Sequence, residues 1–498
     1  MKRNNEKGSA LIFALILLLV LSAMAGSLMF LSNSETFSSM NYRMMTQARY
    51  GAEAGVNAAA NFLMSANYVP PAAPAPGAEF PGYNTLTAYP VQTAGGGNVI
   101  LTTIPGQQSS YPDGQMVAAF QNNMNANQPL QHGGQNGVNT VNYYASAQLM
   151  SMVSIIPFGT TQPVTVQTWQ ITGHGDIANV QNGEAEVVTT LERYISATFS
   201  YAAFAAGKDC GELQFNGNGS TNGYDSGGLP VVGGVVQAPS AANLLGYGGN
   251  VGTNGNETNN GANPTINGSL SSPNAGFGVC SGGSVTALSG GGQVKGGLIQ
   301  LPSAVTFPPP AVIAPLAGTP NTTPGCTVNP CDLKLTNGTL TLTPGTYTVN
   351  SLSISGNASI SVAPYPPGSP NAGQYGPIIL NVVNQPTTGN NQNLPISITG
   401  NAIDNPSYDP SMLQILCCGQ GTPANPVIKI AGNGANAAVV YAPTSTVDFS
   451  GNAKFYGSVI ANQLTDVGNG DIYYDMKLKK KLFTVGNYVL NAFTWNKY

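Results

Sequence analysis

The run KGSALIFALILLLVLSAMAGSLMFLSNSE, Lys7 to Glu35, sets the architecture of this 498-residue chain. It has no charged residue from Gly8 to Ser34, and a helix of that length, rising about 1.5 Å per residue, can cross a hydrocarbon layer of about 30 Å. A cleaved secretory signal has a shorter apolar core, of about 7–15 residues. The run therefore predicts a retained transmembrane helix over about residues 9–31, and the basic residues before it favour a cytoplasmic N-terminus.

The helix is expected to continue well beyond the apolar run, because the first proline is Pro70. Apolar residues recur every three or four positions and form one stripe: Phe37, Met40, Met44, Ala48, Ala52, Val56, Ala59 and Leu63. This spacing predicts one helix of about 55 residues, whose first half lies in lipid and whose second half packs on a folded domain. The alanines, with Gly51 and Gly55, would also let other helices approach closely.

A short basic leader ending in Gly, followed by an apolar helix that becomes amphipathic, resembles the class III signal and N-terminal helix of type IV pilins. It is most similar to the PilX-type N-terminal domain of the minor pilins of pilus assembly, over about the first sixty residues. The residues that carry the resemblance are Gly8, Ala10, Leu11, Glu35, Asn41, Arg43, Ala48, Ala52, Glu53, Ala54 and Gly55.

The resemblance implies processing by a prepilin peptidase between Gly8 and Ser9. The retained helix would first anchor the protein in the bacterial inner membrane and then pack among other pilin subunits in a fibre at the cell surface. The residues expected to govern insertion and packing are Phe13, Glu35, Asn41, Arg43, Ala48, Ala52, Glu53 and Gly55.

The chain departs from major pilins at the fifth position after the predicted cut. Major pilins carry Glu there, which is thought to pair with the terminal amine of a neighbouring subunit, whereas this chain has Phe13. An apolar residue at this position resembles both PilX-type proteins and the tip pseudopilins of type II secretion. Since a subunit that lacks the pair on one side is tolerated best at a fibre end, the resemblance favours a tip position in a type IV pilus, with the secretion pseudopilus as the alternative.

The rest of the chain predicts an α+β protein with two β-rich regions. The Pro/Ala stretch after Asn67 is expected to be an extended linker, and strands of alternating polarity follow it up to about Ala206. Such a sheet would be antiparallel and would cover the outer half of the N-terminal helix. The predicted domains are residues 1–8 (leader), 9–67 (helix), 68–206 (pilin-like β domain), 207–476 (β-helix) and 477–498 (basic tail).

From Leu213 onward, short β-branched segments alternate with Gly-Asn turns. Asn433, Asn452 and Asn469 are separated by 19 and 17 residues (452 − 433 and 469 − 452), a spacing typical of solenoids. We therefore expect a right-handed parallel β-helix, with a β-sandwich as the alternative and with residues 300–345 and 404–426 as excursions. The region also resembles the β-helical domains found behind PilX-type N-termini. The side chains expected to stack inside it are Ile354, Ile360, Ile398, Ile430, Val447 and Phe449.

The composition narrows the classes of function. Only 7% of residues are charged and the net charge is −4, so the basic surface that nucleic acid requires is missing. The four lysines of KLKKKL, residues 477–482, are expected to be solvated surface. The six cysteines favour disulfides in an exported protein, and Cys326 and Cys331 are the pair that closes most easily. No cofactor and no metal ligands are expected, although the Asx-rich stretch GTNGNETNNG, residues 252–261, could suit calcium.

Catalysis is the less favoured hypothesis. The two histidines, His132 and His174, have no nucleophile motif nearby. A membrane-anchored carbohydrate-active β-helix enzyme would need clustered carboxylates, and the candidates are Asp448, Asp466, Asp471 and Asp475. Because Asp is also a common turn residue, we expect a non-enzymatic, structural protein that displays its β-rich module for adhesion to a surface or a glycan.

Overall fold

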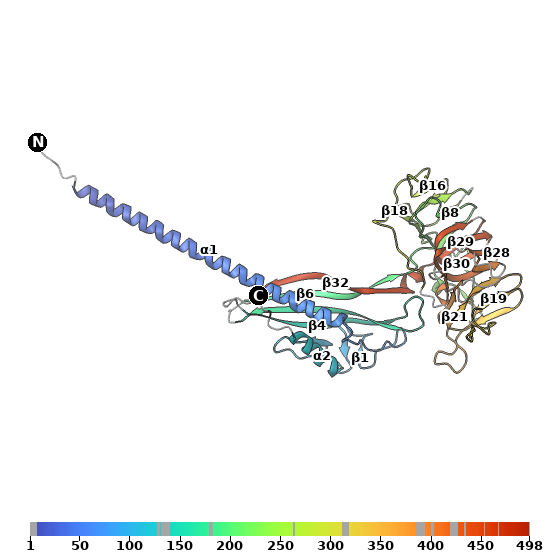
Figure 1. Ribbon diagram of the computed structural model, residues 1–498, viewed down its shortest axis with the longest axis horizontal. Coiled ribbons are helices and arrows are strands. Elements are labelled where there is room, and N and C mark those ends of the chain that lie inside the picture. Colours follow the sequence, from blue (N-terminus) through green and yellow to red (C-terminus); the bar gives the residue numbers. More distant parts are fainter. Residues whose placement is uncertain are drawn as a thin grey trace. The chain divides into compact units, whose positions relative to one another are not determined.

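The computed structural model describes residues 7–126, 130, 140–178, 183–261, 264–310, 318–384, 394–399, 403–418, 427–432, 435–452, 454–466 and 468–497. The chain divides into two compact units (Figure 1). Unit 1 contains Met1–Ile155, Val164–Tyr194 and Gly486–Tyr498, and unit 2 contains Ile156–Pro163 and Ile195–Val485.

Unit 1 is a long helix packed on an antiparallel sheet. Helix α1, Lys7–Met64, has 58 residues, close to the predicted length, and its second half lies over the sheet (Figure 1). The sheet has the strand order β3-β4-β5-β6-β32. The bounds of its strands are Ile100–Thr102, Val141–Ile155, Val164–Ile177, Glu184–Ala197 and Phe483–Lys497. The smaller elements are β1 (Tyr83–Asn84), β2 (Gln92–Thr93) and α2 (Gly114–Asn125).

The Pro/Ala stretch packs on unit 1 and does not form a linker. Tyr68 and Phe80 at its two ends are buried, and the Tyr68 hydroxyl donates to Gln167 Oε1 at 2.8 Å. Thr165 Oγ1 on β5 donates to the Pro71 carbonyl. Because the apolar residues at both ends are buried in the core of unit 1, the stretch marks no domain boundary.

Unit 2 is a parallel β-solenoid, the β-helix-like fold that the sequence predicted, and its strands stack in three columns. The first column stacks β21 (Gly345–Val349), β24 (Ile378–Val382), β27 (Leu413–Cys417), β29 (Ala435–Gly451), β30 (Lys454–Asp466), β7 (Ala203–Ala205), β12 (Val251–Thr253), β15 (Leu270–Ser272) and β18 (Leu298–Gln300). The long strands β29 and β30 bend and contribute to all three columns.

The second column passes through the later parts of β29 and β30. Its other strands are β19 (Asp332–Leu335), β22 (Ser351–Ile354), β25 (Ile396–Thr399), β28 (Val427–Gly432), β8 (Leu213–Phe215), β13 (Glu257–Asn259) and β16 (Leu288–Gly290). The third column contains β20 (Thr339–Leu342), β23 (Ser359–Val362), β26 (Ile403–Asp404), β31 (Asp471–Asp475), β9 (Ser220–Tyr224), β14 (Thr265–Ile266) and β17 (Gln293–Val294).

The order of the coils along the stack differs from their order in the sequence. The first coil, β7–β9, pairs with the last, β30–β31, so the chain enters and leaves in the middle of the solenoid. It runs first to the end formed by β16–β18, crosses to the end formed by β19–β21, and returns coil by coil (Figure 1). Of the two predicted excursions, residues 332–345 and 413–417 are coil strands, and residues 301–310 belong to the crossover.

The interior of the returning coils is a set of aliphatic rows. Ile354, Ile398, Ile430 and Phe449 stand in register on successive strands, and all six side chains predicted to point inward are buried. At the turns, Asn469 Nδ2 donates to Asn452 Oδ1, and Asn218 Nδ2 donates to Asn469 Oδ1, each at 3.1 Å. The asparagine spacing is thus that of stacked turns; Asn433 lies outside the described residues.

The described part of the solenoid contains three disulfides. Cys326 is bonded to Cys331, the pair singled out in the sequence. Just before this pair, Thr323 Oγ1 and Asn321 Nδ2 donate to the Thr348 carbonyl at the β21 edge. Cys210, between β7 and β8, is bonded to Cys280, between β15 and β16, and adjacent Cys417 and Cys418 are bonded to each other.

The last residues form a strand, where the sequence predicted a basic tail. Residues 477–480 lie in the 3-10 helix η3, Met476–Lys480, and Phe483–Lys497 is β32, the neighbour of β6 in the unit 1 sheet. The solenoid is therefore inserted between the last two strands of the sheet. The coils of the solenoid pair only with one another, and the unit 1 sheet gains its last strand, β32, after the chain leaves the solenoid.

Candidate functional site

The candidate site is helix α1, whose two halves differ in environment. The apolar first half of α1 is not buried against any described part of the chain, and Phe13 and Phe30 on it are 71% and 78% exposed. From Ala48 onward the stripe predicted from the sequence, Ala48, Ala52, Val56, Ala59 and Leu63, is almost fully buried. One helix thus presents a bare apolar rod at one end and a docked face at the other.

Four glycines bring the docked half of α1 into backbone contact with the sheet. A Cβ at Gly173 or Gly175 on β5 would overlap the carbonyl oxygens of Ala52 and Ala48, respectively. A Cβ at Gly55 on the helix would overlap the Tyr144 carbonyl of β4. Such close approach of a helix to a strand is open only to residues without a side chain.

This packing corrects one expectation about the helix. The sequence predicted that Gly51, Gly55 and the alanines would let other helices approach, but Ala48, Ala52 and Gly55 face the sheet of the same chain. The part of the stripe from Ala48 to Leu63 is confirmed, whereas Phe37 and Met40 of the same stripe are exposed. The partner of the stripe was not predicted, because the glycines that complete the contact lie more than one hundred residues away on β5. They are the glycines on either side of His174.

The other residues singled out on α1 remain on its surface. Phe13, Glu35, Asn41 and Arg43 are all exposed, so they are free to face lipid or neighbouring subunits. Glu53 is engaged within the helix, where its Oε1 accepts from Arg49 Nε at 3.3 Å. Gly8 and Ser9 lie in the first turns of the helix.

The four aspartates proposed as catalytic do not converge. Asp448 pairs in register with Thr465, and Phe449 pairs with Asp466, so Asp448 points outward and Asp466 inward from the same wall. Burial raises the pKa of Asp466 to about 7, although the hydrogen bond that its Oδ1 accepts from the Gly468 N–H lowers the pKa in part. Burial also raises the pKa of Asp448, and Lys429 opposes that effect.

The remaining two aspartates are held by local hydrogen bonds. Asp471 Oδ1 accepts from the Ser220 N–H and hydroxyl, and its Oδ2 accepts from the Tyr473 hydroxyl. Asp475 Oδ1 accepts from the backbone N–H groups of Ser226 and Lys477. Asp475 therefore caps η3, the kind of local role that the sequence favoured, whereas Asp471 holds the paired strand β9 through Ser220.

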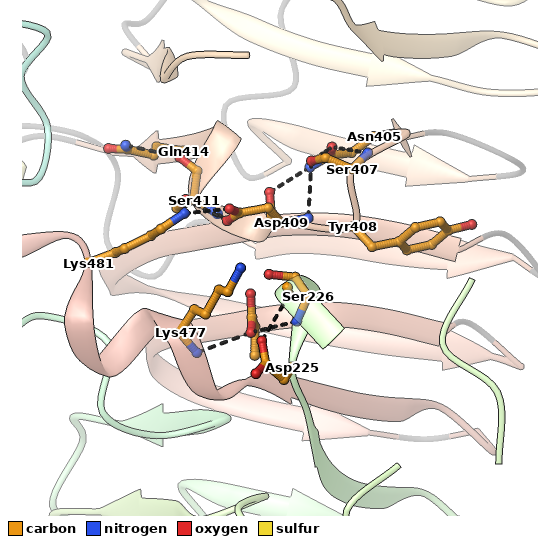
Figure 2. A network of polar contacts seen from close by, with 12 residues as sticks. Asp225, Ser226, Asn405, Ser407, Tyr408, Asp409, Ser411, Gln414, Lys477 and Lys481 are labelled. Atoms are coloured by element: carbon orange, nitrogen blue, oxygen red, sulfur yellow. Dashed lines mark hydrogen bonds and ion pairs between the residues drawn. The ribbon is translucent and has the colours of Figure 1, made fainter. Parts of the chain in front are cut away.

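Lys477 and Lys481 take part in a polar network that the sequence did not reveal, whereas Lys479 and Lys480 are exposed, as predicted (Figure 2). Three 3-10 helices, η1 (Ser226–Gly228), η2 (Pro410–Met412) and η3, are each capped by an aspartate: Asp225, Asp409 and Asp475. Lys481 Nζ forms an ion pair with Asp409 Oδ2, and Asp409 Oδ1 accepts a hydrogen bond from the Ser411 N–H. This network fixes the point at which the chain leaves the last coil.

Of the two histidines, only His174 belongs to the described part of the chain. His174 lies 4.0 Å from Glu184 Oε2 on the adjacent strand, and His132 lies outside the described residues. Among the residues that the structure describes, no group of three or more His, Cys, Asp and Glu side chains could hold a metal ion. The Asx-rich stretch is largely buried in the solenoid, and Glu257 inside it has its pKa raised to about 8 by burial.

Two segments of the chain match known protein families, and one of them contains the exposed half of α1. Residues 7–57 match the PilX N-terminal family, and residues 380–481 match a domain of unknown function (DUF7305). This chain carries a PilX N-terminal domain. This match relates the chain to the minor pilins of type IV pili, and the first half of α1 is long and apolar enough to cross a membrane.

The other comparisons add little to that assignment. The competence-associated pilin ComZ from Thermus thermophilus aligns with 91% of this chain and 97% of its own, at 12% identity and a TM-score of 0.27. A TM-score this low does not establish a shared fold. A search of curated proteins finds no match. The DUF7305 segment corresponds to the returning coils β24 to β31 with the polar network that follows them.

Proposed function

We propose that this protein is a minor pilin-like subunit that is anchored in the inner membrane through α1, enters a type IV pilus or related fibre at its tip, and displays the solenoid for adhesion. No bond is made or broken in this role. The observation that carries the proposal is the division of α1 into an exposed apolar half and a half docked by glycines on its own sheet.

The division suits a helix that has two successive environments. An exposed apolar rod of this length is stable in lipid and equally stable among the helices of neighbouring subunits, where apolar contact replaces contact with acyl chains. The docked half keeps the folded units attached to the rod in both states. Association with other pilus subunits follows from the same surface.

The tip position is supported by Phe13. This side chain is 71% exposed on the apolar rod and, unlike a carboxylate, it cannot form an ion pair with the terminal amine of an adjacent subunit. A subunit that lacks this pair would be tolerated best where one neighbour is absent. The N-terminus would be cytoplasmic before assembly, as the leader lysines and arginine indicate.

N-terminal sequencing of protein recovered from sheared surface fibres tests the proposal. The expected sequence begins at Ser9, and immunogold labelling of the solenoid is expected at fibre ends. Recovery of intact chains beginning at Met1, and only in membranes, would contradict it.

A pair of substitutions tests the tip assignment. Phe13→Glu restores the carboxylate of major pilins and is expected to allow labelling along the fibre shaft. Leu17→Glu, four residues further along the same exposed rod, is the matched control and should abolish insertion because a charge in the apolar rod has no partner. Identical behaviour of the two variants would remove the special role of Phe13.

A further inference from the structure

The second column of the solenoid carries a continuous row of outward-facing polar side chains. In-register parallel pairing connects nine positions, one on each strand: Lys334, Ser353, Ser397, Lys429, Asp448, Thr465, Gln214, Thr258 and Ser289. None of the nine is buried, and neighbouring strands repeat at about 4.8 Å. The row is thus a straight ladder along the outside of the unit.

The two halves of this row differ in how their polar groups are used. In the outgoing coils, Gln214 Nε2 donates to the Gly211 carbonyl, and the Thr258 hydroxyl contacts both Ser289 and Asn256. In the returning coils, the side chains of Ser353, Ser397, Lys429, Asp448 and Thr465 make no hydrogen bond with any other described residue. We call these five stacked residues the open ladder.

The five residues of the open ladder combine donors and acceptors and carry no net charge among themselves; Lys334, the next exposed residue of the row beyond Ser353, adds one positive charge at its end. Lys429 and Asp448 face each other on adjacent strands and balance one another, and hydroxyls lie on both sides of them. A hydroxyl group both donates and accepts, so an alcohol-rich ligand can give its proton to the carboxylate and accept from the ammonium, each a charge-assisted hydrogen bond. A polyanion lying along the same row would meet the carboxylate of Asp448 near its centre, which repels it.

We infer that the open ladder, Ser353, Ser397, Lys429, Asp448 and Thr465, binds an uncharged polysaccharide lying along the solenoid. This inference deepens the proposed adhesive function, since it names the face and the class of ligand. Four of the five residues lie within the segment that matches the domain of unknown function, residues 380–481, and the inference therefore gives that segment a binding role.

Binding of the detergent-solubilised full chain to immobilised neutral dextran and cellulose, with polygalacturonate and duplex DNA as anionic comparisons, tests the inference. Retention on a neutral polymer is expected. The double variant K429M/D448N should weaken it roughly tenfold or more, because it removes the two charged groups that can make the strongest hydrogen bonds to a hydroxyl. Ser397→Val and Thr465→Val should each weaken it less.

Thr341→Val provides the matched control, because Thr341 is an exposed, outward-facing residue of β20 in the third column. It should bind as the unchanged protein does, and circular dichroism of every variant should report an intact solenoid. Binding to neither neutral polymer, binding to the anionic polymers alone, or equal binding by K429M/D448N and Thr341→Val would overturn the inference.

The test is separable from that of the proposed function. K429M/D448N should still appear in sheared fibres, because the open ladder is remote in sequence from α1. Neutral-polymer binding by a chain that never enters fibres would uphold the ladder and refute the pilin role. Fibre incorporation without binding that depends on the open ladder would support the pilin role and refute the open ladder as a binding site.

Discussion

The two units of this protein bury their interiors in opposite ways. In unit 1 the helix lies on the sheet because Gly51, Gly55, Gly173 and Gly175 remove side chains from the contact, so that backbone meets backbone. In unit 2 the interior is made of side chains stacked in register on successive coils. The contrast shows why unit 1 should be intolerant of added atoms, whereas unit 2 should be intolerant of lost ones.

Adding one methyl group to the unit 1 contact should have the largest effect. Gly175→Ala places a Cβ on the Ala48 carbonyl, the Ala52 amide and the Gly51 backbone at once, and is expected to destabilise unit 1 by about 3 kcal/mol or more. Hydrogen exchange of the unit 1 amides in the solubilised chain measures this. Gly26→Ala, at a position with open space around it, should be neutral or slightly stabilising; similar exchange in both variants would refute the contact.

Removing atoms from a unit 2 row should have the next largest effect. Ile398→Ala leaves a void between Ile354 and Ile430 and should cost about 2–5 kcal/mol, seen as faster exchange in β22, β25 and β28. The neighbouring Ser397→Ala changes an outward residue and should stay within about 0.5 kcal/mol. If the two substitutions cost the same, the assignment of inward and outward positions would be wrong.

The polar residues inside the outgoing coils should make unit 2 sensitive to pH. Burial raises the pKa of Glu257 from 4.5 to about 8, so the folded chain holds a proton that the unfolded chain releases. The contribution of Glu257 to the free energy of unfolding is fully present below about pH 4.5. It is lost as the pH rises to about 8, by roughly 1.4 kcal/mol per pH unit.

Glu257→Gln removes its titration and should flatten the dependence above about pH 7; below that pH Asp466, whose pKa burial raises from 3.8 to about 7, still supplies a slope of the same sign. Urea unfolding of unit 2 at pH 5, 6.5 and 8 is the measurement. Parallel curves for the unchanged protein and the Gln variant would show that Glu257 is ionised in the folded state or exposed.

The smallest effect is expected at the end of the last coil. Lys481→Met removes the ion pair with Asp409, which is partly exposed, and should cost about 0.5–1.5 kcal/mol, with a weaker dependence on salt afterwards. The control Lys479→Met affects an exposed lysine of η3 and should be silent in thermal unfolding. A silent Lys481→Met would mean that the Asp caps alone hold this network.

Much of the candidate site could be predicted because it depends on local periodicity. The length of α1, its apolar first half and the stripe from Ala48 to Leu63 all follow from spacing along a single helix. The coils of the returning half could also be predicted from the sequence, because each coil needs a tight turn and Gly and Asn favour the backbone conformation of such turns.

What the sequence by itself determined is therefore the local character of each segment: an apolar helix, alternating strands and stacked turns. Only the tertiary structure decided which segments meet. It placed Gly175 under Ala48, the last coil upon the first, and the C-terminal strand beside β6. The physical reason is that side-chain periodicity reports which face of an element is buried, whereas the partner of that face depends on contacts between residues far apart in the chain, which no local pattern records.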